Sequence, residues 1–153
     1  MRRLASICCI TALLGCGGTD DTPDVAADSV PAAAPAAALS LADVTGTWNV
    51  QVMPEASDSV LLTYVLNAPA DTAAWSIKFA DRAEPVPVKI LAVDGDSLVI
   101  HAGPYSSALR KGVTVETHVV SRIENGVMVG RAIATYSAGP DSVVTLRTRG
   151  TRQ

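Results

Sequence analysis

The sequence predicts an all-β domain in the form of an eight-stranded antiparallel up-and-down barrel. Apolar and polar residues alternate with a period of two through residues 41–153, and turn residues separate the alternating segments. No connection between these segments needs a crossover helix, so neighbouring strands should pair antiparallel. A sandwich of two four-stranded sheets is the alternative, but only a closed barrel leaves no sheet edge unpaired.

Eight segments have the pattern of strands. The first begins at Gly46-Thr47-Trp48, and the third, at residues 74–80, alternates apolar and polar side chains without a break. The predicted strands are residues 46–53, 58–66, 74–80, 86–93, 97–103, 113–123, 127–136 and 142–149. Asp94-Gly95-Asp96 and Glu124-Asn125-Gly126 have the composition of hairpin turns, because glycine adopts a positive φ without strain.

The seventh strand indicates which faces point into the barrel. Turning its larger aliphatic side chains inward would bury Arg131 without a partner, at a cost of several kcal/mol. Leaving them outside forfeits at most about 1.5–3 kcal/mol each. We therefore expect the smaller face to point inward. The candidate interior residues are Trp75, Ile77, Phe79, Thr117, Gly130, Ala132, Ala134 and Tyr136. The small residues among them either leave a ligand cavity or match the large aromatic side chains in a packed core, and the sequence leaves both readings open.

The first sixteen residues have the pattern of a targeting signal. Arg2 and Arg3 precede an uncharged apolar stretch, residues 4–14, that is too short to span a bilayer. It ends in Leu13-Leu14-Gly15-Cys16, which resembles the lipobox of bacterial lipoproteins. An ordinary secretory signal that happens to contain a cysteine is the alternative.

The lipobox resemblance implies a lipoprotein signal peptide over residues 1–15 and cleavage before Cys16. It further implies diacylglycerol on the Cys16 thiol and a fatty acyl chain such as palmitate on the new N-terminus, which together anchor the protein stably in a membrane. The expected location is the cell envelope. In the lipoproteins that the lipobox resembles, an aspartate directly after the lipidated cysteine signals retention in the inner membrane. By the same resemblance, Gly17 at this position implies the outer membrane, facing the periplasm or the cell surface.

The residues between the lipidated cysteine and the strands predict a tether. Residues 16–40 are rich in alanine, proline and aspartate, and Pro23, Pro31 and Pro35 interrupt every run that alanine would otherwise make helical. No apolar face is available for packing. We expect a semi-rigid spacer that holds a domain of residues 41–153 away from the bilayer.

Two features at the ends of the predicted barrel resemble the lipocalin and wider calycin pattern. Gly46-Thr47-Trp48 opens the first strand, and Arg147 and Arg149 lie at the end of the last. In that pattern a tryptophan closes the barrel base and an arginine from the last strand lies across its ring. The resemblance implies Trp48 as the plug and Arg149 as its partner, with Arg147 as the alternative. The domain is shorter than secreted lipocalins and lacks their C-terminal helix and cysteine pairs.

Composition and motifs argue against several functions. The 12 basic against 15 acidic residues and the aromatic content of 4% are unfavourable for nucleic-acid binding. No nucleophile elbow, zinc-protease motif or phosphate loop is present, so we expect neither an enzyme nor a cofactor. His101 and His118 are expected on the polar faces of their strands, with Glu116 beside His118, and two imidazoles are too few for a metal site.

Two functions remain. The first is a membrane-tethered barrel that binds a small apolar or amphiphilic ligand. In that case, Tyr105 and Leu109 from the loop at residues 104–111 would cover the mouth, and Arg110 and Lys111 would contact an anionic head group. The alternative is a non-catalytic envelope protein with a packed barrel, which docks onto a protein partner through Val127, Val129 and Ile133 on its outer face.

Overall fold

The computed structural model of this chain describes residues 38–153. The predicted signal peptide, Cys16 and all but the last three residues of the predicted tether lie outside the described residues. The described part is all-β, with one short α-helix and one 3-10 turn. No helix in it is long and apolar enough to cross a membrane.

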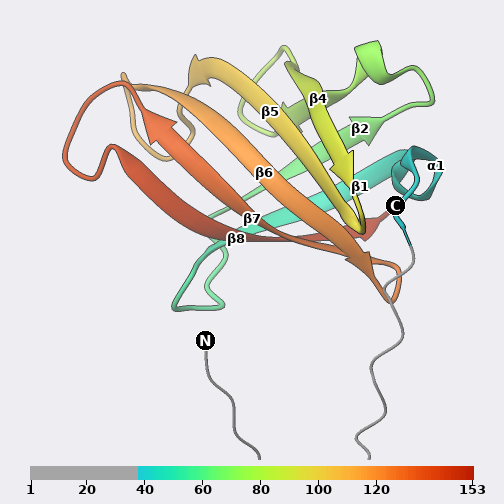
Figure 1. Ribbon diagram of the computed structural model, residues 1–153. Helices are drawn as coiled ribbons and strands as arrows, with labels where there is room; N and C mark the ends of the chain where they lie inside the picture. Colours follow the sequence, from blue (N-terminus) through green and yellow to red (C-terminus); the bar gives the residue numbers. More distant parts are fainter. Residues whose placement is uncertain (1–37) are drawn as a thin grey trace, which may run out of the picture. The chain divides into compact units, whose positions relative to one another are not determined.

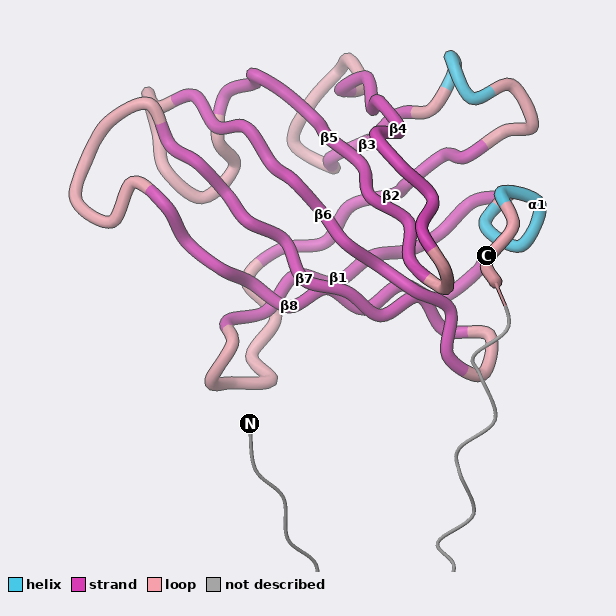
Figure 2. The backbone as a smooth tube through the Cα atoms, in the orientation of Figure 1, coloured by secondary structure: helices cyan, strands magenta, loops and turns pink. Residues whose placement is uncertain are grey.

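Eight strands form a closed antiparallel barrel (Figure 1). In chain order they are β1 (Gly46–Pro54), β2 (Leu62–Ala68), β3 (Ser76–Phe79), β4 (Val86–Asp94), β5 (Ser97–Ser106), β6 (Thr114–Glu124), β7 (Val127–Tyr136) and β8 (Val143–Arg152). Each strand pairs with the next along the chain, and β8 returns to pair with β1 (Figure 2). The up-and-down barrel predicted from the sequence is confirmed, and the sandwich alternative is not adopted.

The pleat of β7 points its small side chains inward, as predicted. Ala132, Ala134 and Tyr136 are buried, whereas Arg131 is exposed and forms an ion pair of 2.7 Å with Glu55. Burial also alternates along β6, where Val115, Val119 and Ser121 are the buried members. The observed orientation of β7 keeps the Arg131 guanidinium exposed and so avoids the free-energy cost of burying it.

The second strand begins later than predicted. β2 starts at Leu62 rather than Asp58, and Val60 and Leu61 are exposed in the loop after β1. Arg147 of β8 holds this loop, because its Nη2 atom donates to the Ser57 carbonyl at 2.7 Å and to Asp58 Oδ1 at 2.8 Å. A short apolar run in a loop has the same composition as a strand, so the pattern alone misplaced the boundary.

The two ends of the barrel are built differently. Helix α1 (Leu41–Val44) lies at one end, together with the C-terminus, and the loop between β7 and β8 lies at the other (Figure 1). The backbone N–H of Leu39 donates to the Gly95 carbonyl at 2.8 Å, which ties the segment before α1 to the β4–β5 turn. The loops after β1, β3, β5 and β7 therefore share the end opposite α1.

Candidate functional site

The α1 end of the barrel is sealed by Trp48. Its side chain is fully buried, and its Nε1 atom donates to the Val44 carbonyl at 2.7 Å. The guanidinium of Arg152 lies 4.4 Å from the indole ring and donates to the Asp43 carbonyl at 2.6 Å. Arg152 also donates to the Thr45 carbonyl. One side chain thus joins β8, the indole ring and α1.

The arginine that covers Trp48 is not the one expected. Arg152 takes this place, whereas Arg149 pairs with Gln51 on the outer face of the barrel. Arg147, the alternative, lies opposite Met53 and holds the loop after β1. The reason is the register: β8 continues to Arg152, the residue directly opposite Trp48.

The opposite end contains a cavity in the barrel interior. Its volume is about 50 Å³, and it extends from the centre of the barrel to the loop between β5 and β6. Six of the eight predicted interior residues line it: Ile77, Phe79, Thr117, Ala132, Ala134 and Tyr136. Tyr64, Tyr105 and Leu109 complete its outer part. The sequence left a cavity and a packed core as alternatives, and the structure has a small cavity above a packed base.

The other two predicted interior residues belong to the packed base. Trp75 is buried, and its Nε1 atom donates to the Pro69 carbonyl at 2.9 Å. Gly130 leaves no space, because a Cβ atom there would lie 2.5 Å from the Val120 carbonyl oxygen and 2.9 Å from Thr148 Oγ1. The glycine allows close approach of neighbouring groups and does not enlarge the cavity.

Aromatic side chains surround the outer part of the cavity. The Phe79 ring lies 5.7 Å from Tyr64 and 5.6 Å from Tyr105, measured between centroids. Burial raises the pKa of Tyr64 above its ordinary value, and the nearby Tyr105 adds to the increase. Burial also raises the pKa of Tyr105. These phenols are therefore neutral hydrogen-bonding groups at physiological pH, in a cavity whose other walls are mainly apolar.

Two arginines lie against these rings. The Arg110 guanidinium is 3.9 Å from the Tyr136 centroid, and Arg82 is 5.1 Å from Phe79 and 5.3 Å from Tyr105. Arg110 donates to the Pro140 carbonyl at 2.9 Å and to the Asp141 carbonyl at 3.2 Å. Sequence analysis missed Arg82, because only the three-dimensional structure brings the loop after β3 next to β5.

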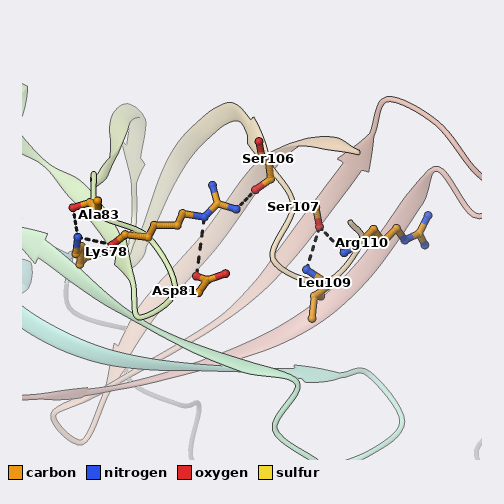
Figure 3. Close-up of polar contacts among 8 residues, drawn as sticks. Lys78, Asp81, Ala83, Ser106, Ser107, Leu109 and Arg110 are labelled. Atoms are coloured by element: carbon orange, nitrogen blue, oxygen red, sulfur yellow. Dashed lines mark hydrogen bonds and ion pairs between the residues drawn. The ribbon is translucent and has the colours of Figure 1, made fainter. Parts of the chain in front are cut away.

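Arginine side chains join the loops at this end to neighbouring segments, and Lys78 of β3 holds the loop that follows its own strand. Arg82 donates to the Ser106 carbonyl and lies 4.0 Å from Asp81, while Lys78 donates to the carbonyls of Arg82 and Ala83 (Figure 3). Arg110 connects the loop after β5 to the loop after β7. The acceptors are mainly backbone carbonyls of loops, which open more readily than strand pairs.

The loop over the cavity, residues 107–113, is compact. The Ser107 hydroxyl accepts hydrogen bonds from the amides of Leu109 and Arg110, at 3.1 and 3.0 Å (Figure 3). Leu109 borders the cavity although it is partly exposed, and Lys111 is exposed. Tyr105 was predicted in this loop. It belongs instead to β5, which continues to Ser106 through a register shift between Ala102 and Tyr105.

The two histidines lie outside this site. They face each other across β5 and β6 with ring centroids 4.7 Å apart, on the outer face of the barrel. Glu116 Oε2 lies 3.7 Å from His101 Nε2, so the carboxylate approaches the histidine of the neighbouring strand. Within residues 38–153, no three histidine, cysteine or acidic residues are arranged to hold a metal ion.

The eight-stranded antiparallel barrel is compatible with a calycin-like fold. Comparisons with protein-family models, with curated proteins and with solved structures found no match for this chain.

Proposed function

We propose that this protein is an envelope-anchored lipoprotein whose barrel binds a small apolar or amphiphilic ligand. The observation that carries the proposal is the interior cavity at the end of the barrel opposite Trp48. Its walls are apolar, phenol groups border it, and it lies directly beneath a loop. Concave apolar sites with a few convergent polar groups are typical of small-molecule binding.

The arginines at the mouth favour a ligand with an anionic head group. Within the described residues Arg110 forms no ion pair, and its guanidinium donates to two neutral carbonyls. An anion would therefore gain a charge-assisted hydrogen bond without displacing a carboxylate. The apolar part of the ligand would lie against Phe79 and Leu109, and its head would lie near Arg110.

The size of the cavity requires the loop at residues 107–113 to move. A volume of about 50 Å³ holds only a few non-hydrogen atoms, whereas sites for drug-sized ligands enclose about 300–1,000 Å³. The loop is held at Ser107 and through Arg110. Outward movement of this loop would enlarge the site without breaking any strand pair, so we expect ligand binding to be coupled to loop opening.

The lipid anchor is proposed from the resemblance of Leu13-Leu14-Gly15-Cys16 to a lipobox. The full chain should therefore fractionate with membranes and incorporate labelled palmitate in a diderm bacterial host. Cys16→Ser should abolish both properties. Cys9→Ser, which lies within the proposed signal peptide, is the matched control and should leave both unchanged. Incorporation of palmitate into the Cys16→Ser protein would contradict the proposal.

The binding function is tested by native mass spectrometry of the full chain purified from membranes, followed by titration with fatty acids and uncharged amphiphiles. We expect a bound mass consistent with a small amphiphile. Ala134→Leu fills the cavity and should weaken binding by more than about tenfold, since the added side chain occupies the ligand volume. Thr135→Leu adds a similar side chain on the outer face and should leave affinity unchanged. Equal affinity of the two variants would contradict the proposed site.

A second candidate function is docking of an envelope protein onto the outer face of the barrel. Of the predicted patch, Ile133 is exposed, while Val127 and Val129 are half-buried. Val120 and Val143 on the neighbouring strands are exposed as well. Cross-linking in intact cells should capture a specific partner if docking is the function, and Ile133→Lys should abolish that cross-link while leaving ligand binding intact.

A further inference from the structure

The barrel is weakly closed between β3 and β4. These strands pair only at Ser76 with Pro87 and at Ile77 with Val86, and Val88 donates one further hydrogen bond to the Trp75 carbonyl. Beyond Val88, β4 continues along β5 alone. Leu39 reaches the Gly95 carbonyl at the turn that follows. Residues 89–94 form a strand edge that pairs with no other described strand on the β3 side, where only the 3-10 turn η1 (Thr72–Ala74), directly before β3, also contacts β4.

This edge is apolar and accessible. Leu91 is 53% exposed and Val93 is 39% exposed, values that are high for aliphatic side chains in a strand. An exposed strand edge offers unpaired N–H and C=O groups, which favour pairing with another strand. Natural edges are commonly protected by a lysine or a bulge, and this edge has both. Lys89 lies at its start, and a register shift lies between Ile90 and Ala92.

The sequence of the edge is complementary to itself in the antiparallel direction. If two copies pair so that Lys89 of each lies opposite Asp94 of the other, Ile90 lies opposite Val93 and Leu91 opposite Ala92. Directly opposed residues must share a face of the sheet. Lys89 and Asp94 pair with His101 and Ser97 on the outer face, and Ile90 and Val93 pair with Ile100 and Leu98 on the inner face. Every opposed pair outside the bulge satisfies this condition.

The bulge is what makes this pairing possible. In a regular strand, residues 89 and 94 would point to opposite faces, because successive side chains alternate. The extra residue at Leu91 shifts this alternation by one position, so that both charged residues point outward. A bulge that would otherwise only protect the edge thus brings the two charges onto the same face.

We propose that the β4 edge, residues 89–94, is a homodimer interface in which β4 of two copies pair antiparallel about a two-fold axis, with Lys89 of each opposite Asp94 of the other. An isologous contact of this kind gives the Lys89–Asp94 pair twice. A strand of another protein without this charge pattern would leave Lys89 and Asp94 without partners. The charges therefore favour pairing with a second copy of this chain. The inference does not depend on ligand binding, since the edge lies outside the cavity.

Sedimentation equilibrium of the full chain in detergent tests this proposal. The protein concentration is varied from micromolar to millimolar, and micelles are kept in excess so that two chains do not share one micelle by chance. The wild type should show a reversible monomer–dimer equilibrium. Lys89→Asp or Asp94→Lys alone places like charges opposite each other at two symmetry-related positions, and each should weaken the dimer by about tenfold. The double variant Lys89→Asp with Asp94→Lys restores opposite charges and should recover wild-type association.

Arg149→Asp makes the same change of charge on the outer face of β8, four strands away from β4 around the barrel, and serves as the matched control. It should leave the dimer unchanged. A monomeric wild type at all concentrations would overturn the proposal, as would a double variant that associates no better than the single ones. Circular dichroism of each variant separates loss of association from loss of folding, and ligand affinity measured on the same samples tests the cavity separately.

Discussion

The two ends of the barrel use the same contact for different purposes. At each end an arginine lies across an aromatic ring and donates to backbone carbonyls. At the α1 end the ring belongs to fully buried Trp48, and strand, helix and ring are joined into one unit. At the other end the ring of Tyr136 borders a cavity, and the carbonyls belong to a loop.

The difference shows that the neighbours of a cation–π contact decide its effect. Opening the α1 end would expose the indole and leave its Nε1–H without the Val44 carbonyl. Opening the other end would move Leu109, which is already partly exposed, release loop carbonyls to water and make the cavity rings more accessible, but it would leave Trp48 and its hydrogen bond in place. The first end is therefore part of the core, whereas the second can open at low cost in free energy.

The largest expected effect is on the sealed end. Trp48→Ala should lower the free energy of unfolding by about 3–5 kcal/mol, because it leaves a large cavity in the core. Urea denaturation followed by circular dichroism measures this loss. Trp48→Phe, which keeps an aromatic ring but removes the hydrogen bond to Val44, should lose less. A loss below about 1 kcal/mol for Trp48→Ala would show that Trp48 does not seal the barrel.

The cavity end of the barrel should control the pH dependence of stability in the alkaline range. The pKa of Tyr64 is raised in the folded state by burial, so above about pH 10 the unfolded chain ionises first and the folded state loses stability. The loss approaches about 1.4 kcal/mol per pH unit for one such group. Tyr64→Phe should reduce this dependence, leaving the contribution of Tyr105, and should shift alkaline unfolding to higher pH. An unchanged pH midpoint would contradict the burial of this hydroxyl.

Arg152 and Arg149, two of the three arginines of β8, allow the sealed end to be compared with the barrel surface. Arg152→Gln should lower the free energy of unfolding by about 1 kcal/mol, because the contact with Trp48 and the charged donors to α1 are lost. Arg149→Gln on the outer face should change it by less than about 0.5 kcal/mol. Thermal denaturation of the two variants in parallel gives the comparison. Equal losses would show that Arg152 adds nothing specific.

Among the contacts that hold the two ends of the barrel, the one at the mouth should have the smallest effect on stability. Arg110→Gln should cost under about 1 kcal/mol, because its partners are solvent-accessible loop carbonyls. The same change should increase amide hydrogen exchange in residues 107–113 and leave the exchange of β1 and β8 unchanged. Uniform exchange throughout the domain would contradict the difference between the two ends.

Alternation of polar and apolar residues predicted most of the fold because each strand has one buried face. In β7 it gave both the bounds and the inward face, since Arg131 made one orientation costly. It failed at Val60 and Leu61, where two apolar residues lie in a loop fixed from a distance by Arg147. It also ended β5 too early, because Pro104 suggested a loop and the register shift that accommodates it leaves no local signal.

The candidate site was predictable only in part. The inward small residues and the loop over the mouth follow from local pattern, whereas Trp48 as the plug was implied by the resemblance of Gly46-Thr47-Trp48 to the lipocalin pattern. The partner of Trp48 depends on the register between the first and last strands, which the sequence of neither strand specifies. The positions of Arg82 beside Tyr105 and of His101 beside His118 likewise depend on which residues meet across strands.

Both limits of the described chain leave the barrel on one side. Leu39 is fastened beside Gly95, and the amide of Gln153 donates to the Thr47 carbonyl at 2.9 Å. Labels, fusion partners or a solid support attached before residue 38 or after residue 153 would therefore start from the Trp48 side. Within residues 38–153 only hairpin connections lie on the Arg110 side, so their length and composition can be varied by evolution or by engineering without rerouting either limit of the described chain.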